Sequence, residues 1–304
     1  MTIVNVLEMI KIAYIILAHT DPLQLKNEVE ALLESGDVFI HINKLNDESQ
    51  FKKTIGTLGC KRVYFTEQRV AVRWAGFSIL QATFNTLRMC LAVKEYDRVV
   101  LLTGQDFPIK SSREIIDFFE EHKNVEFVKS QPISGKDYPS SYKMVFRDNR
   151  LYMAIYTRLE KLVPAKYLRW KKDYVTYKGK RYSLYAISPK WALTGMTAKK
   201  VCDFFFNAKE VTRYYKSKHA GDDTYVATVL RILGIEESTI SKFNLFYEKK
   251  LFGQGISCKT LDITDLQDII GTDEFFARKF GSQTSNGLVD CLFKMWKDND
   301  RFIR

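Results

Sequence analysis

Short apolar runs alternate with amphipathic stretches along the first 130 residues of the chain. The apolar, β-rich runs cover residues 12–19, 37–43, 62–66 and 96–103, and the amphipathic ones cover 22–35, 47–58, 76–93 and 112–122. Strands that alternate with helices in this way predict an α/β fold, with a Rossmann-type, mostly parallel sheet flanked by helices on both faces. Ligands of such sheets bind where the strands end.

The pattern changes after residue 130 and becomes regular again near residue 188. Residues 131–187 are basic and aromatic with weak periodicity, whereas 189–195 predict a strand and 198–208 and 222–234 predict helices. No repeat or Pro/Gly/Ser linker interrupts the chain. We therefore expect a single domain over 1–304, with a nucleotide-binding half (1–130), an excursion on the acceptor or membrane side (131–187), and a catalytic, diphosphate-binding half (188–304).

Composition narrows the class of partner. The 304 residues carry 47 Lys plus Arg against 36 Asp plus Glu, a net charge of +11, which favours nucleic acid, an anionic membrane or a diphosphate substrate. Five scattered cysteines without a Cys-x-x-Cys pair indicate neither a disulfide framework nor a zinc site. Cysteines of this kind indicate reduced thiols and a cytoplasmic location. Glu8 and Lys11 interrupt the amino-terminal apolar run, so we expect no signal peptide.

Several common sites are missing from the sequence. No Gly-x-Gly-x-x-Gly follows the first strand and no P-loop occurs, which disfavours NAD enzymes and P-loop nucleotidases. The four histidines do not pair at ligand spacing, and the only Asp-x-Asp, at 298–300, has no strand before it. We expect no metal site. A nucleotidyl- or phosphotransferase would need a carboxylate pair at a strand end, which is not found.

Two groups of charged residues are candidates for chemistry. In "KHAGDDTYVATVL" the pattern predicts Asp222 as a helix N-cap and Asp223 in the first turn, where a carboxylate can also act as a general base. Near the carboxyl terminus stand Lys259, Arg278 and Lys279. A single Lys or Arg is usually a solvated surface charge, but Lys279 lies among phenylalanines, which favours a buried phosphate contact.

The segment 161–181 is the most basic part of the chain. It holds eight Lys or Arg residues against Asp173 alone, interleaved with Tyr167, Trp170, Tyr174 and Tyr177. Three interpretations are open: a solvated helix face, a nucleic-acid patch, or a contact with an anionic membrane surface.

Taken in order, the motifs resemble glycosyltransferase family 14, the core-2/I-branching β-1,6-N-acetylglucosaminyltransferases and peptide xylosyltransferases, in a bacterial-looking form. The resemblance covers most of the chain. Its motifs are "IAYIILAH", "VFIHINK", "VRWAGFSILQA", "YDRVVLLTGQDFPIKS", "GDDTYVATVL" and "FFARKF".

The resemblance implies a GT-A-like fold and inverting, metal-independent transfer from a UDP-sugar. Asp223 takes the position of the catalytic base, Lys279 that of a diphosphate-binding Lys, and Lys259 that of an Arg. Trp74 falls where an aromatic lies beside the nucleotide, and Asn43 where an Asp meets the nucleoside. Asp for Glu, Lys for Arg and Asn for Asp depart from the family, so the donor sugar stays open among N-acetylglucosamine, xylose, galactose and galactofuranose.

The prediction is therefore an inverting, metal-independent glycosyltransferase without a cofactor, acting on a glycan acceptor, lipid-linked, in bacterial surface polysaccharide synthesis. The donor site would also include Ala18, His19, Arg278 and Asp106, with the turn at 104–108. The segment 161–181 would hold the enzyme peripherally at the inner face of the plasma membrane, and nucleic acid is not an expected partner. The rival interpretation is a basic α/β nucleic-acid-binding protein, supported by the net charge of +11.

Overall fold

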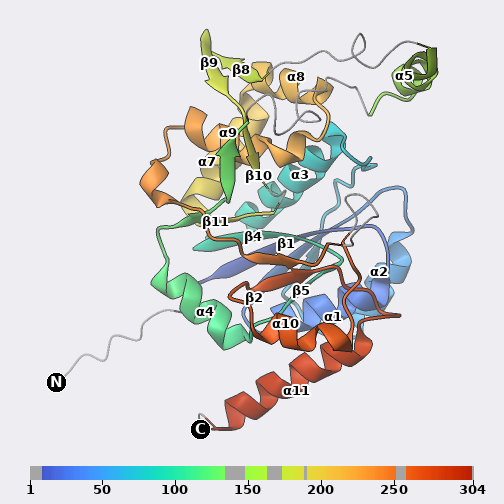
Figure 1. The fold of residues 1–304 in the computed structure, drawn as a ribbon, viewed down its shortest axis with the longest axis vertical. Coiled ribbons are helices and arrows are strands. Elements are labelled where there is room, and N and C mark those ends of the chain that lie inside the picture. Colours follow the sequence, from blue (N-terminus) through green and yellow to red (C-terminus); the bar gives the residue numbers. More distant parts are fainter. Residues whose placement is uncertain (1–8, 134–147, 163–172, 188–189, 251–257, 303–304) are drawn as a thin grey trace, which may run out of the picture.

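A computed structural model describes residues 9–133, 148–162, 173–187, 190–250 and 258–302 (Figure 1). Its main sheet has seven strands in the order β12-β6-β11-β4-β1-β2-β3. These strands are β1 (Ile12–Ala18), β2 (Gly36–Ile42), β3 (Val63–Phe65), β4 (Arg98–Thr103), β6 (Glu126–Phe127), β11 (Ala192–Thr194) and β12 (Ile240–Ser241).

The middle of this sheet is parallel. β1 pairs in parallel with β2 on one side and β4 on the other, and β2 pairs in parallel with β3. Only β11 runs antiparallel to its neighbours β4 and β6 in this sheet of the described chain. The predicted α/β class with a mostly parallel sheet is confirmed. After β1 the chain adds β2 and β3 on one side of β1 and then β4 on the other side. The strand order therefore reverses between β1 and β4, and such a switch point is where open α/β sheets bind ligands.

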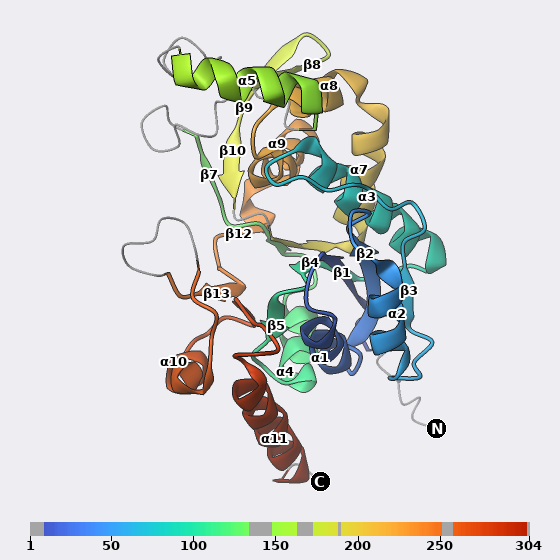
Figure 2. The same cartoon turned by 90° about the vertical axis from the view of Figure 1, so that its right-hand side faces the viewer.

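Helices cover both faces of the sheet (Figures 1 and 2). One face carries α1 (Pro22–Leu32), α2 (Glu48–Gly56) and α4 (Ser112–Glu121), and the other α3 (Phe77–Val93), α7 (Gly195–Asn207) and α9 (Tyr225–Ile232). Side chains of β1 alternate between the two cores: Tyr14 packs with the α1, α2 and α4 side, whereas Ile15 packs with the α3 side. Both cores are apolar, so neither face of the strand meets water.

The helix expected at 222 begins later than predicted. Residues Gly221–Asp223 form a 3-10 turn, η1, in which Thr224 N–H donates to the Gly221 carbonyl at 3.1 Å. Thr224 precedes α9, and no side chain caps its first turn. The prediction of Asp222 as the N-cap is therefore wrong, because local turn bonds take the amide that such a cap would bind.

A smaller three-stranded sheet follows directly from β4. It consists of β13 (Phe246–Glu248), β14 (Phe276–Arg278) and β5 (Asp106–Pro108), in that order. Phe107, Ala277 and Phe280 belong to a third apolar core. The helices α10 (Leu266–Ile270) and α11 (Asn286–Phe302) contribute side chains to that core, and η3 (Ile263–Asp265) directly precedes α10. The small sheet thus carries carboxyl-terminal residues to the end of β4.

The remaining elements lie at the opposite end of the molecule from α11 (Figure 2). They are α5 (Arg150–Leu162), β8 (Tyr174–Tyr177), β9 (Lys180–Ser183) and α8 (Lys209–Ser217), with β7 (Ser130–Pro132) paired to β10 (Tyr185–Ile187) nearer the sheet and η2 (Glu237–Thr239) beyond α9. Of the basic segment, residues 163–172 lie outside the described residues, Tyr167 and Trp170 among them. Residues 161 and 162 end α5, whereas 174–181 belong to the β8–β9 hairpin, so a solvated helix face is wrong for 174–181.

Candidate active site

The ends of β1 and β4 approach each other closely. Ala18 is buried at the end of β1, and His19 follows it in an exposed position. Gly104 N–H, just after β4, donates to the Leu17 carbonyl at 3.0 Å. A Cβ atom at Gly104 would lie 2.8 Å from that of Ala18, so only glycine fits this turn. Close backbone contact therefore fixes the positions of the ends of β1 and β4 relative to each other.

The carboxyl-terminal cations are tied to this edge of the sheet by backbone hydrogen bonds. Ser282 N–H donates to Asp21 Oδ2 at 2.8 Å, and Asp21 is also the N-cap of α1. Phe280 N–H donates to the Gln105 carbonyl at 2.9 Å. Partial burial and the positive charges of Arg278 and Lys279 lower the pKa of His19. Sequence positions about 260 residues apart thus share one electrostatic environment.

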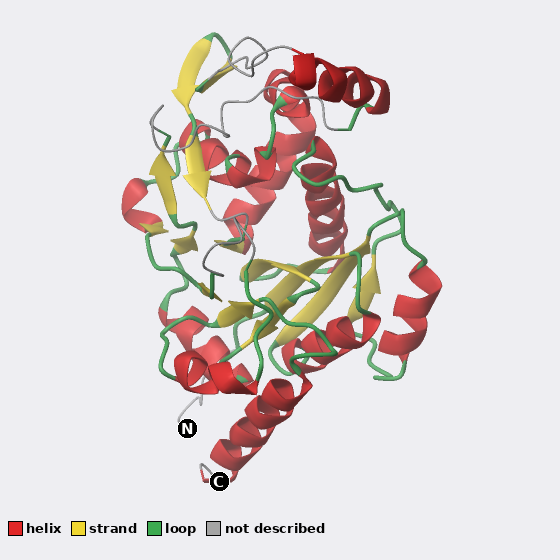
Figure 3. Ribbon diagram, turned by 45° about the vertical axis from the view of Figure 1, so that its right-hand side comes forward, coloured by secondary structure: helices red, strands yellow, loops and turns green. Residues whose placement is uncertain are grey.

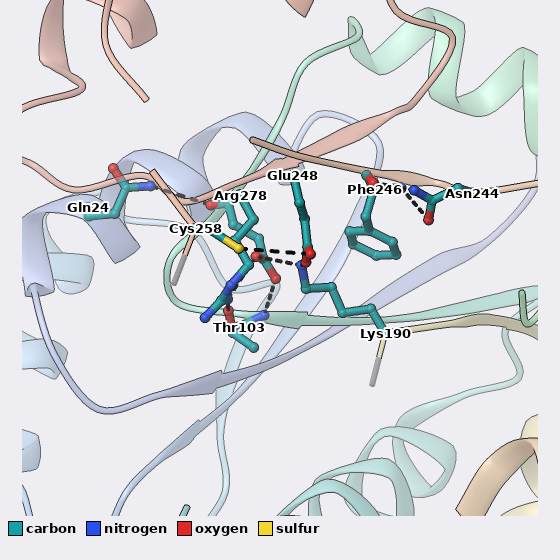
Figure 4. A network of polar contacts seen from close by, with 9 residues as sticks. Gln24, Thr103, Lys190, Asn244, Phe246, Glu248, Cys258 and Arg278 are labelled. Carbon is teal, nitrogen blue, oxygen red and sulfur yellow. Dashed lines mark hydrogen bonds and ion pairs between the residues drawn. The ribbon is translucent and has the colours of Figure 1, made fainter. Parts of the chain in front are cut away.

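A row of alternating charges crosses the small sheet. Register places Glu248 opposite Arg278, and Arg278 opposite Asp106. Arg278 Nη1 lies 3.1 Å from Asp106 Oδ1 and also donates to the Thr103 hydroxyl. Lys190 Nζ lies 2.9 Å from Glu248 Oε1 and 3.4 Å from Asp106 Oδ1 (Figure 4). Opposite charges in such cross-strand neighbours stabilise the pairing and fix the guanidinium in place.

Asp106 is fully buried within this row. Its Oδ2 accepts from Thr103 N–H at 2.7 Å, which closes the turn after β4. A carboxylate with no exposed surface cannot touch a ligand in this arrangement, so its place in a donor site is indirect: it orients the turn and Arg278. The prediction that the turn at 104–108 shapes the site is compatible with this geometry.

A second buried carboxyl lies behind Asp106. Glu28 of α1 is fully buried, and neither of its oxygens has a hydrogen-bond partner among the described residues. Burial, together with the charge of Asp106, raises the pKa of Glu28 well above its ordinary value, against the opposing effect of Arg278 and Lys190. The shift favours the neutral form of Glu28, which avoids the cost of an unpaired buried charge.

The two predicted diphosphate lysines differ in their surroundings. Lys259 Nζ lies 2.6 Å from Asp265 Oδ2 and 3.2 Å from Asp262 Oδ2. The Nζ of Lys279 makes no ion pair within the described part of the chain, although its backbone N–H donates to the Lys259 carbonyl at 3.3 Å. A phosphate would have to displace two carboxylates to reach Lys259. Lys279 is thus the better placed cation.

Asn43 uses its whole amide to hold a neighbouring loop. Its Oδ1 accepts from Val72 N–H at 3.0 Å, and its Nδ2 donates to the Val72 carbonyl at 3.1 Å. Its own N–H donates to the Ala18 carbonyl at 2.8 Å. A carboxylate could accept from Val72 but could not donate to it, which explains an amide at this position. The ends of β1 and β2 are thereby linked to the loop that carries Trp74.

Trp74 lies against the loop that leads into the carboxylate pair. The Trp74 indole is 76% exposed and meets the His219 ring edge-on, with centroids 5.6 Å apart. Next to them, Ala220 N–H donates to the Ala75 carbonyl at 2.9 Å. Both alanines have positive φ angles, 57° for Ala75 and 47° for Ala220. Left-handed backbone at non-glycine residues costs energy and is often found at functional sites.

The carboxylate pair is partly exposed and lies near Lys218, which is almost fully buried. Burial raises the pKa of Asp223 to about 7 and that of Asp222 to about 6, and the charge of Asp222 adds to the effect at Asp223. Burial lowers the pKa of Lys218 to about 8, against the attraction of both carboxylates. A carboxylate whose pKa is near 7 is suited to accept a proton at neutral pH.

The structure therefore forms two groups from the predicted residues. The first group lies at the ends of β1 and β4 and consists of Ala18, His19, Asp106, Arg278 and Lys279. In the second, Trp74 contacts the loop that carries Asp223. Lys190, Glu28 and Lys218 were not foreseen, because a single Lys or Glu in the sequence carries no sign of burial. Nowhere in the described chain do three His, Cys, Asp or Glu side chains lie close enough to bind one metal ion.

Comparison with known proteins gives a consistent result. A family model described as "Branch: Core-2/I-Branching enzyme" matches residues 12–248. The "Beta-1,3-galactosyl-O-glycosyl-glycoprotein beta-1,6-N-acetylglucosaminyltransferase 4" of Mus musculus is 22% identical over 95% of this chain and 66% of its own length. The human "Probable beta-1,3-galactosyl-O-glycosyl-glycoprotein beta-1,6-N-acetylglucosaminyltransferase 7" is 30% identical over 44% of this chain and 33% of its own length. Human "Xylosyltransferase 2" is 26% identical over 42% of this chain and 15% of its own length. The chain thus spans less than two thirds of each of these relatives.

Proposed function

The chain belongs to the Core-2/I-branching enzyme family, and we propose that it is an inverting glycosyltransferase that moves a sugar from a UDP-sugar to a hydroxyl of a glycan acceptor. The observation that carries this proposal is Asp223, a partly exposed carboxylate with its pKa raised to about 7, in the loop whose His219 contacts the exposed Trp74. Membership in the family supports sugar transfer, and the separate cationic group supports a diphosphate-bearing donor.

Asp223 would act as the general base. In an inverting transfer the acceptor oxygen attacks the anomeric carbon of the donor while its proton passes to the base. The bond between that carbon and the diphosphate oxygen breaks, and its electron pair leaves with UDP. Trp74, exposed beside this loop, offers an apolar surface against which a sugar ring can pack.

The negative charge that develops on the diphosphate needs fixed cations. Lys279 and Arg278 would supply them, because they lie at the switch point where open α/β sheets bind ligands. Asp106 and Thr103 hold the Arg278 guanidinium in advance, so little reorganisation is needed during the reaction. Lys259 would contribute only if phosphate displaced Asp262 and Asp265. No divalent metal enters this proposal, and activity in excess EDTA is its direct test.

The relatives suggest which donors to examine first. Their names describe transfer of N-acetylglucosamine and of xylose, so UDP-N-acetylglucosamine and UDP-xylose come before UDP-galactose and UDP-galactofuranose. A donor that binds only the folded state raises the free energy of unfolding, by about 2.7 kcal/mol when its concentration is a hundred times its Kd. The unfolding temperature rises accordingly. As the acceptor substrate we propose a lipid-linked glycan used in polysaccharide synthesis.

The decisive variant is Asp223→Asn. We expect kcat to fall by about 10²- to 10⁴-fold, as for loss of a general base, while the Kd for UDP stays within about twofold. Asp222→Asn is the matched control, since it removes the adjacent carboxylate, and it should retain most of the rate. If Asp222→Asn abolished transfer and Asp223→Asn did not, the roles would be exchanged. A product with retained anomeric configuration by NMR would refute the inverting mechanism.

The nucleic-acid alternative is tested in the same set of measurements. Calorimetry should show UDP binding to the wild-type protein, weakened by Lys279→Ala. Tight binding of a mixed oligonucleotide with no response to any UDP-sugar would instead support the nucleic-acid interpretation.

A further inference from the structure

Helix α5 exposes a row of large apolar side chains. The row consists of Leu151, Ile155, Leu159 and Leu162, which are 73%, 50%, 40% and 80% exposed. Spacings of three and four residues place them on one side of the helix. Tyr156 is buried and holds another side of α5 against the protein. The row therefore faces away from the core and is not covered by any described residue.

Such a concentration is unusual in this molecule. Four of the twelve exposed large apolar side chains of the described residues lie on α5, and each of the other described helices has at most one. Scattered exposed apolar residues need no explanation, whereas a continuous row marks an interaction surface. The question is which partner would cover it.

Positive charge surrounds this end of the molecule. The β8–β9 hairpin exposes Lys178, Lys180 and Arg181, and α8 exposes Lys209, Arg213 and Lys216 at spacings of four and three residues. Hairpin and helix are joined by a hydrogen bond from Lys178 N–H to Glu210 Oε1 at 2.6 Å. α5, β8 and α8 lie at the same end of the protein, as Figures 2 and 3 show. Arg158 adds an exposed cation on α5 itself.

The hairpin cations also lie over aromatic rings. Arg181 stands 4.7 Å from the Tyr174 ring centroid, and Lys180 stands 5.2 Å from that of Tyr182. Tyrosine is enriched at the headgroup level of bilayers, because one end of its side chain is apolar and the other is polar.

We propose that this end of the protein binds an anionic membrane surface, with the apolar row of α5 lying in the interface and the α8 and hairpin cations against the headgroups. A row of leucine and isoleucine side chains beside exposed cations is the composition of an interfacial helix. Nucleic acid would match the cations but would leave the apolar row uncovered. A second copy of the chain would bring two basic surfaces together. No helix in the described part of the chain is long and apolar enough to cross a bilayer.

Vesicle flotation without any sugar substrate tests this directly. Wild-type protein should float with vesicles of phosphatidylcholine and phosphatidylglycerol, and binding should weaken with salt and be much lower on phosphatidylcholine alone. Replacing all four residues of the row by serine should lower the partition coefficient at least about tenfold, because their burial in the interface is lost. Circular dichroism should show an unchanged fold.

Matched variants separate the contributions. Serine at four exposed apolar positions elsewhere, Leu23, Leu45, Ile263 and Ile270, should leave binding unchanged. Glutamine at Lys178, Lys180 and Arg181 should reduce the salt dependence, whereas glutamine at the exposed Lys53, Lys61 and Lys294 should not. Wild-type protein that does not float, or a serine variant that floats equally well, would overturn the proposal. So would size-exclusion chromatography showing a dimer that the serine variant loses, since a second copy would then cover the row.

Discussion

Replacing Asp106 by asparagine removes one negative charge from the row of alternating charges across the small sheet, with little change in the shape of the side chain. The amide oxygen of the new side chain could still accept the Thr103 N–H bond, which is 2.7 Å long in the wild type. What is lost is the negative charge facing Arg278 Nη1 at 3.1 Å and Lys190 Nζ at 3.4 Å. Both cations would then be left without this buried partner, and the amide would present N–H groups to one of them.

The expected cost follows from the burial of the three groups. Removing one partner of a buried ion pair typically costs about 3–5 kcal/mol. Arg278 is about a quarter exposed, and Lys190 keeps Glu248 at 2.9 Å, so the low end of that range, about 3 kcal/mol, applies here. Against a typical total stability of about 5–15 kcal/mol this is a large fraction. The melting temperature should fall by roughly 6–12 °C for a chain of this size.

Urea unfolding followed by circular dichroism measures this loss. Asp117→Asn is the matched control, because Asp117 pairs with Arg113 at 2.8 Å on the surface of α4, where both side chains are mostly exposed. It should cost about 0.5 kcal/mol or less. The reasoning fails if Asp106→Asn costs less than about 1 kcal/mol, or if the control costs as much. UDP affinity should also fall in Asp106→Asn, since Arg278 loses the partner that orients it.

Three further predictions concern the same region. Burial raises the pKa of Glu28 in the folded protein well above its value in the unfolded chain. The stability of the wild type is therefore highest below the unfolded pKa and decreases as the pH rises toward the folded pKa. Urea unfolding should show Glu28→Gln becoming more stable relative to wild type between pH 5 and pH 8, and a constant difference would contradict this. Because the base form of Asp223 exists above its pKa of about 7, kcat/KM should fall as the pH drops below 7, and Asp222→Asn should move that inflection to lower pH by removing a neighbouring negative charge. Asn43→Asp should cost about 1–3 kcal/mol, because a carboxylate would face the Val72 carbonyl that the amide now bonds, and an unchanged midpoint in chemical unfolding would rule this out.

The local patterns of the sequence were sufficient for the fold class and for most of the strands and helices of the first 130 residues. The apolar runs at 12–19 and 37–43 are observed as β1 and β2, and the amphipathic stretch at 112–122 is observed as α4, capped by Ser111 with Glu114. These elements depend on periodicity and on capping residues within a few positions, which the sequence displays directly. The resemblance to the family also rested on short motifs, and the family model confirms it over residues 12–248.

The tertiary structure alone decided how the charged residues are used. A lysine looks the same in the sequence whether it is exposed, as Lys180 is, or almost fully buried, as Lys190 is. The pairing of Arg278 with Asp106 depends on the register of two strands 172 positions apart. Equally, Lys259 forms ion pairs with Asp262 and Asp265 because the turn at Asp262 brings both carboxylates next to it. Burial and long-range pairing set the charge and orientation of these groups, and both arise only when distant segments pack together.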